Sequence, residues 1–132
     1  PLYSSAASDV YKRQLPIMAV AGAVGVWLFY VQHQYEGVYW ARDAEWDFVK
    51  SALEGSSYYK LPRALQWVTG NIGLHHIHHL QPRIPNYHLQ RAHDEVPAMQ
   101  DVTPITLRTS LKSLFMNLWD EEQQQLVSFR AL

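Results

Sequence analysis

Residues 15–31 read LPIMAVAGAVGVWLFYV, the longest uncharged stretch of a 132-residue chain. These 17 residues would extend about 25 Å as a helix, at the short end of the range that crosses a bilayer. Membrane helices pack closely through small side chains, and the stretch carries several: Ala19, Ala21, Gly22, Ala23 and Gly25. We therefore predict a transmembrane helix over residues 15–32.

The flanks of this stretch favour a membrane helix. Aromatic side chains gather at its C-terminal end and just beyond it, as in an interfacial belt: Trp27, Phe29, Tyr30, Tyr35, Tyr39 and Trp40. The alternatives are a buried helix of a soluble core and the apolar part of a secretory signal, but no small-residue cleavage site comes after it. Of the eleven basic residues only Lys12 and Arg13 precede the helix, so the rest of the chain is predicted to be cytoplasmic.

The first 14 residues, PLYSSAASDVYKRQ, differ in composition and period from the rest of the chain. They look like translated read-through or adapter sequence, so we treat residues 1–14 as a non-native leader and leave them out of the fold. On that interpretation the native chain begins partway through a longer reading frame.

Residues 33–132 are predicted to form a helical cytoplasmic cap region, which makes the fold mainly α. The predicted helices cover 45–53, the segment from Pro62 through the histidines to Pro82, 86–94, and a segment opened by Pro104. Apolar side chains recur at helical spacing in the last helix and are expected to be core: Leu107, Leu111, Leu114, Phe115 and Leu118. A short strand over 126–129 is predicted after a polar turn.

Composition excludes several kinds of protein. Cysteine is absent, which rules out disulfide scaffolds, zinc ribbons, iron–sulfur clusters and thiol nucleophiles. The formal net charge is -1, so the chain lacks the excess of basic residues that is typical of nucleic-acid binding. The length allows one domain or a piece of one. Any bound metal must therefore be held by nitrogen or oxygen.

Four of the seven histidines fall within the segment His75-His76-Ile77-His78-His79. On a helix, at about 100° per residue, His75, His78 and His79 share one arc, so three imidazoles are expected to face one point. Neutral imidazole binds iron, zinc, copper and nickel. The alternative is an exposed histidine patch or a local zinc-binding tract. The apolar residues around these histidines on a predicted helix favour a metal site within the fold over an exposed tract. His76 is an additional candidate ligand.

Residues outside this segment complete the predicted site. His33 comes directly after the predicted membrane helix, at the membrane interface, and an ionisable residue at that depth is a candidate further ligand. Metal-bound histidines usually donate their other ring N–H to an oxygen, and Asn71, one turn before His75, is predicted for that role. His88 and His93 lie among polar residues and are expected to be solvated.

Three blocks together resemble the membrane fatty acid desaturases, and in particular the acyl-lipid type related to Δ12 (omega-6) desaturases. They are YVQHQYE over 30–36 after the membrane helix, GNIGLHHIHHL over 70–80, and RIPNY over 83–87. The second is similar to the last histidine box of that family. The resemblance runs from about Leu15 to the C-terminus, although H-x-x-H-H alone also occurs in related membrane hydroxylases.

The resemblance implies a di-iron centre at the cytoplasmic membrane face of an integral membrane protein. Its ligands would include His33, His75, His78 and His79, and the enzyme would use O₂ to place a cis double bond in an acyl chain. The substrate would be an acyl lipid, an acyl-CoA or an acyl carrier protein, with ferredoxin or cytochrome b5 as electron donor. Position alone suggests three channel residues: Tyr58, Tyr59 and Trp67.

The chain departs from the family pattern in lacking two earlier histidine boxes, because no histidine precedes His33. We therefore expect a C-terminal fragment of a multi-pass fold that alone neither holds two irons nor desaturates. The alternatives are a hydroxylase of the same superfamily, a non-catalytic membrane-anchored metal-binding protein, and a haem-bearing anchor with His33 as axial ligand.

Overall fold

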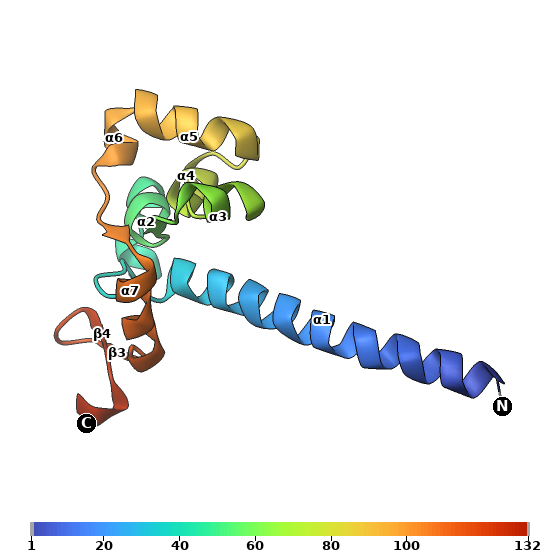
Figure 1. The fold of residues 1–132 in the computed structure, drawn as a ribbon. Coiled ribbons are helices and arrows are strands. Elements are labelled where there is room, and N and C mark those ends of the chain that lie inside the picture. The colour runs from blue at the N-terminus through green and yellow to red at the C-terminus, as the bar shows by residue number, and fades with distance from the viewer. Residues whose placement is uncertain (1, 132) are drawn as a thin grey trace. The chain divides into compact units, whose positions relative to one another are not determined.

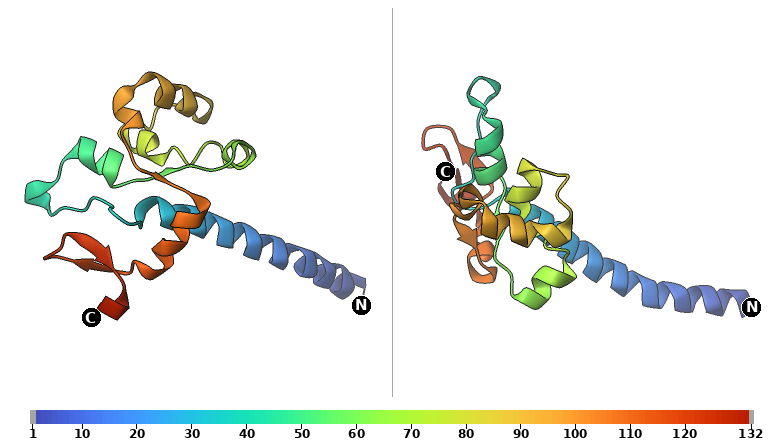
Figure 2. Two further views of the ribbon diagram at one scale, coloured as in Figure 1. Left: turned by 60° about the vertical axis from the view of Figure 1, so that its left-hand side comes forward. Right: turned by 90° about the horizontal axis from the view of Figure 1, so that it is seen from above.

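The computed structural model describes residues 2 to 131 and is mostly helical, which confirms the mainly α prediction (Figure 1). The chain divides into two units, one ending at Tyr30 and the other beginning at Val31. A single helix, α1 (Leu2–His33), makes up the described part of the first unit, and its last turn belongs to the second. Both views in Figure 2 show this helix without a break.

Helix α1 contains the apolar stretch that the sequence predicts as a membrane span. Its segment Ser8–His33 has a mean hydropathy of 1.7, and among the described helices it alone is long and apolar enough to cross a membrane. Ile17, Val20 and Val26 are each at least 66% exposed. Such an apolar surface is typical of a helix whose neighbour is lipid or another membrane helix. The helix also includes residues 2–14, so no change of secondary structure marks the predicted leader.

The first predicted helix of the second unit is confirmed, with a later start. A 3-10 turn, η1 (Asp43–Glu45), precedes α2 (Phe48–Glu54). Asp47 begins α2, because its Oδ1 accepts a hydrogen bond from the Lys50 backbone N–H at 2.7 Å. That bond satisfies one of the backbone donors that a helix leaves unpaired at its start.

The prediction of one helix from Pro62 through the histidines is wrong. The structure has two helices, α3 (Arg63–Val68) and α4 (His75–Leu80). Between them Gly70 has φ 63° and Asn71 has φ 58°, both left-handed backbone conformations. A right-handed helix cannot pass through two such residues, so α4 takes a direction of its own. The histidine helix is therefore short and depends on its neighbours for its position.

The core of the second unit surrounds α4. Leu74 and Ile77 are buried with Leu89 of α5 (Asn86–Glu95) and Met99 of α6 (Pro97–Gln100). Helix α4 lies against α2 and α5 (Figure 1), and α5 and α6 meet at a corner in gold and orange (Figure 2). The structure thereby confirms the helix predicted over 86–94.

The C-terminal prediction of a long amphipathic helix is also wrong. Strand β2 (Pro104–Ile105) pairs in parallel with β1 (Tyr58–Tyr59), and then come α7 (Leu107–Ser110) and the 3-10 helix η2 (Leu111–Phe115). A capping box of Thr106 and Thr109 begins α7. The 3-10 helix has three residues per turn, so the apolar residues of the predicted stripe, which would share one face of an α-helix, no longer do so. Four stripe residues are consequently exposed: Leu107, Leu111, Leu114 and Phe115.

A hairpin comes next. Leu118, the last residue of the predicted stripe, begins strand β3 (Leu118–Asp120), which pairs antiparallel with β4 (Gln125–Val127). A final 3-10 turn, η3 (Phe129–Ala131), comes after β4. The strand predicted near residues 126–129 is thus present, one residue earlier and shorter, after the predicted polar turn.

Candidate metal centre

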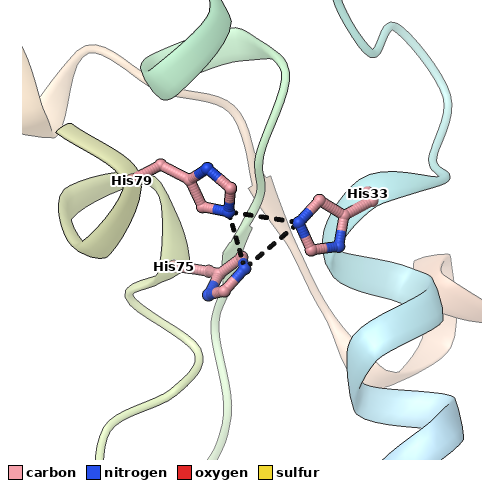
Figure 3. Close-up of side chains that lie close together, drawn as sticks. All are labelled: His33, His75 and His79. Atoms are coloured by element: carbon pink, nitrogen blue, oxygen red, sulfur yellow. Dashed lines mark hydrogen bonds between the residues drawn. The ribbon is translucent and has the colours of Figure 1, made fainter. Parts of the chain in front are cut away.

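Three histidines from two helices bring their Nε2 atoms together (Figure 3). His33 is the last residue of α1, and His75 and His79 lie one turn apart on α4. The Nε2 atoms are separated by 3.1 Å between His33 and His79, 3.3 Å between His33 and His75, and 3.0 Å between His75 and His79. Figure 3 shows the three rings turning these nitrogens toward a common point. We call these residues the three-histidine cluster.

Hydrogen bonding alone cannot satisfy the three-histidine cluster. A neutral imidazole Nε2 is either an N–H donor or a lone-pair acceptor, so among three mutually close Nε2 atoms at least two are of the same kind. One of the three contacts is then repulsive unless a cation lies between the nitrogens. With metal–nitrogen bonds of about 2.1 Å, ligands 90° and 109° apart lie about 3.0 and 3.4 Å from each other. The observed separations fall within that interval, so the cluster fits a metal ion.

The electrostatics of the cluster favour the neutral, metal-binding form of its rings. Burial, and then the neighbouring imidazole of His79, lowers the pKa of His75 to about 3. Burial, followed by His33 and His78, also lowers the pKa of His79. Both rings are therefore neutral at physiological pH, and a lone pair is available without displacing a proton.

The remaining histidines of the segment point elsewhere. His78 is exposed, and its ring lies 5.6 Å from the ring of His75, outside the three-histidine cluster. The sequence predicted that His75, His78 and His79 face one point, and in the structure only His75 and His79 do so. His76 is fully buried on the core side, where its Nε2 lies 3.1 Å from the Met99 carbonyl oxygen. Burial lowers the pKa of His76 to about 4, although the Met99 carbonyl opposes the shift.

A hydrogen-bonded strap joins the two ligand-bearing segments. The Gln32 side chain donates to the Ile72 carbonyl at 2.8 Å, and the Ser57 backbone N–H donates to the Gln32 carbonyl at 2.9 Å. The His76 backbone N–H in turn donates to the Ser57 carbonyl at 3.3 Å. Gln32 and Ser57 are both almost completely buried. Sequence reasoning missed these residues, and the one signal for them was a glutamine beside His33 at the end of an apolar helix.

The predicted supporting residue takes a different partner. The Asn71 side chain donates to the Asn86 carbonyl at 2.9 Å, and its left-handed backbone forms the turn before α4. The prediction that His93 is solvated is wrong, because its ring is half-buried and lies 4.7 Å from the ring of Tyr58 and 5.8 Å from that of His76. His88 is exposed, as predicted.

The three predicted channel residues do not share a described cavity. Tyr59 is buried with its hydroxyl 3.1 Å from Ser110 Oγ, and Trp67 is 81% exposed. Tyr58 lines a cavity of about 320 Å³ that also contains three carboxylates: Glu36, Glu54 and Asp101.

A different cavity, of about 420 Å³, opens beside His33. Its walls carry the apolar side chains of Val38, Trp40, Trp119 and Leu126 together with the polar side chains of Gln34, Ser51 and Asn117, and no Asp, Glu, Lys or Arg of the described residues lines it. Trp40 and Trp119 pack together with ring centroids 5.3 Å apart. The volume lies within the range of small-molecule sites, and the lining is uncharged with both apolar and polar side chains.

Comparison with known proteins finds sequence similarity to fatty acid desaturases. The family model for fatty acid desaturase matches residues 14–109, which include all three members of the cluster. A fatty acid desaturase of Bacillus subtilis (strain 168) is 56% identical over 119 residues, which cover 90% of this chain and 34% of that protein. The chain thus spans about one third of the length of that relative.

More distant plant proteins match shorter segments. A chloroplastic omega-6 fatty acid desaturase of Arabidopsis thaliana is 33% identical over 52 residues, 39% of this chain and 12% of that protein. An endoplasmic reticulum omega-3 fatty acid desaturase of Vigna radiata is 33% identical over 75 residues, 51% of this chain and 18% of that protein. No solved structure matches. With a family model that covers most of its length, the chain belongs to the fatty acid desaturase family.

Proposed function

We propose that this chain is the C-terminal part of a di-iron, O₂-dependent membrane desaturase that introduces a cis double bond into an acyl chain. The observation that carries the proposal is the triangle of Nε2 atoms of His33, His75 and His79, which hydrogen bonding cannot satisfy and a metal can. These three residues would hold one iron. His78, outside the triangle, would serve a second iron together with ligands from the rest of the protein.

The chemistry requires a metal. No side-chain acid, base or nucleophile removes hydrogen from an unactivated methylene group, so a bound di-iron centre would supply that oxidation. The overall reaction would convert –CH₂–CH₂– to –CH=CH–, and the two hydrogens removed from the chain, together with two electrons and two protons from outside, would reduce O₂ to two waters. A donor such as ferredoxin or cytochrome b5 would provide the electrons.

The residues of this chain would hold and shield the site. His75 is 8% exposed, so the protein encloses that ligand on most sides and keeps its ring neutral. We assign the uncharged cavity beside His33, whose apolar wall is formed by Val38, Trp40, Trp119 and Leu126, to an acyl substrate carried by a lipid, coenzyme A or an acyl carrier protein. An apolar helix that ends at His33 would bring the site to the membrane surface, where acyl chains are reached, and we assign this surface to the cytoplasmic side.

The same proposal covers the organisation of the chain. Residues 15–32 would be the membrane helix and residues 33–132 the cytoplasmic cap that binds metal. Residues 1–14 would be a non-native leader, of which the family match, beginning at residue 14, includes only the last residue.

The test is iron content and fatty-acid profile of cells expressing the complete gene. We expect a new unsaturated acyl chain with the unchanged protein, and its loss together with iron in His79→Ala and His78→Ala. The matched control is His88→Ala, an exposed histidine on α5, which should keep both. Hydroxylated acyl chains would identify the hydroxylase alternative. Iron binding with no change in lipids would favour a non-catalytic metal protein.

A further inference from the structure

His76 differs from its neighbours on α4 in what its ring contacts. It has no exposed surface, and its Nε2 lies 3.1 Å from the Met99 carbonyl oxygen of α6. Its ring centroid is 5.5 Å from that of Tyr58 and 5.8 Å from that of His93. None of these contacts belongs to the three-histidine cluster. Helix α4 therefore presents histidines in two directions, toward the cluster and into the core.

The hydrogen bond to Met99 determines which nitrogen of His76 carries the proton. A carbonyl oxygen only accepts, so Nε2 must be the N–H donor and the lone pair must lie on Nδ1. That Nδ1 is buried and has no hydrogen-bond partner among the described residues. A metal ligand needs an accessible lone pair. In this arrangement Nε2 is committed to Met99 and Nδ1 is enclosed, so His76 is not placed to bind the metal.

Helix α4 needs support from outside itself. It has only six residues, and no side-chain hydrogen bond caps its start at Leu74. Helices this short are unstable alone and depend on tertiary contacts. His76 supplies two of these contacts, because its backbone N–H donates to the Ser57 carbonyl and its ring donates to the Met99 carbonyl.

We infer that His76 is a positioning residue: by bonding α4 to the carbonyl of Met99 it fixes the direction in which His75 and His79 present their Nε2 atoms to the metal. This inference rests on the proposed metal site for its functional consequence. It also explains the residue type, since an apolar side chain would fill the space and leave the Met99 carbonyl without this donor.

The variants His76→Phe and His76→Gln separate shape from hydrogen bonding. Phenylalanine keeps a flat ring but removes the donor, whereas glutamine restores an N–H at a similar distance from the backbone. His79→Ala removes a proposed ligand, and His88→Phe is the matched control on the exposed face of α5. The chain is purified in detergent micelles for two measurements, amide hydrogen exchange of residues 75–80 without metal and titration with Co²⁺.

The expected result is faster exchange over residues 75–80 in His76→Phe and an affinity for Co²⁺ lower by about 10–100-fold, as for other residues that orient metal ligands. Stoichiometry should stay unchanged, and His76→Gln should recover both properties. His79→Ala should lose Co²⁺ binding, and His88→Phe should match the original chain in both measurements.

Two results would overturn the inference. The first is unchanged exchange over residues 75–80 in His76→Phe, since the ring would then hold nothing in place. The second is loss of Co²⁺ in His76→Gln to the same extent as in His79→Ala, which would make His76 a ligand. If His76→Phe fails to fold, His76→Gln decides alone through retained or lost Co²⁺. If the unchanged chain binds no Co²⁺, the proposed metal site fails, and the exchange measurement still decides the role of His76.

Discussion

Gln32 connects the two segments that carry the three-histidine cluster, and its replacement by leucine tests how the site is held. The side chain is 2% exposed, and its Nε2 donates to the Ile72 carbonyl at 2.8 Å. Gln32 precedes His33, and Ile72 lies three residues before His75. Leucine keeps most of the volume and the backbone hydrogen bond to Ser57, but it removes the amide donor.

The size of the effect depends on this single bond. Removing one partner of a buried hydrogen bond costs about 1–3 kcal/mol, because the other group stays desolvated. At 1.4 kcal/mol for each factor of ten, that is about a 5–150-fold change in the folding equilibrium. Without this hydrogen bond the position of the His33 ring relative to His75 would also be less restrained. Residues that orient metal ligands are typically worth about 10–100-fold in metal affinity.

Chemical unfolding and Co²⁺ titration in detergent micelles measure both effects. The control is Gln90→Leu, because Gln90 is exposed and its side chain bonds Asp94 one turn along the same helix at 3.0 Å. That variant should change stability by no more than about 0.5 kcal/mol. The reasoning is refuted if Gln32→Leu and Gln90→Leu have the same unfolding free energy and the same Co²⁺ affinity.

Other predictions use the same preparation. The 132-residue chain alone should bind one metal ion and show no desaturation, and two tightly bound irons with turnover would contradict the fragment interpretation. His78→Ala should retain that single metal ion in this chain, whereas His75→Ala should lose it, as measured by elemental analysis. Without metal, the chain should lose stability as pH falls from about 6.5 toward 3, because the pKa of His75 is about 3 when folded and near 6.5 when unfolded, so the unfolded state binds more protons. A stability that is constant across that range, measured by chemical unfolding, would count against the burial of His75. Tyr59→Phe should lower the unfolding free energy by about 0.5–1.5 kcal/mol, because Ser110 keeps its hydrogen bond to the Leu107 carbonyl, and Ser110→Ala should cost about 1–3 kcal/mol, because it removes the Ser110 contact of the buried Tyr59 hydroxyl.

Local sequence signals predicted those parts of the fold that do not depend on distant residues. The apolar stretch forms a helix because seventeen uncharged residues in a row favour that state in lipid or in a core. The helix after Pro85 and the strand near the C-terminus also obey local rules. The predictions failed where the chain leaves a periodic pattern, at Gly70 and Asn71 and again after Ser110. In both places apolar spacing suited a helix, and turn conformations overrode it.

For the site, the sequence by itself determined the donor set: imidazoles in a cysteine-free chain, four of them in one segment and His33 at the end of an apolar helix. Only the tertiary structure decided which of them meet. Helical periodicity places His75, His78 and His79 on one face of a helix, but it does not predict which other element of the fold lies opposite that face. The hydrogen bonds of Gln32 and Ser57 hold His33 opposite His75 and His79. The hydrogen bond to the Met99 carbonyl holds the ring of His76 in the core. These hydrogen bonds join residues 19 to 40 positions apart, and no local pattern encodes them.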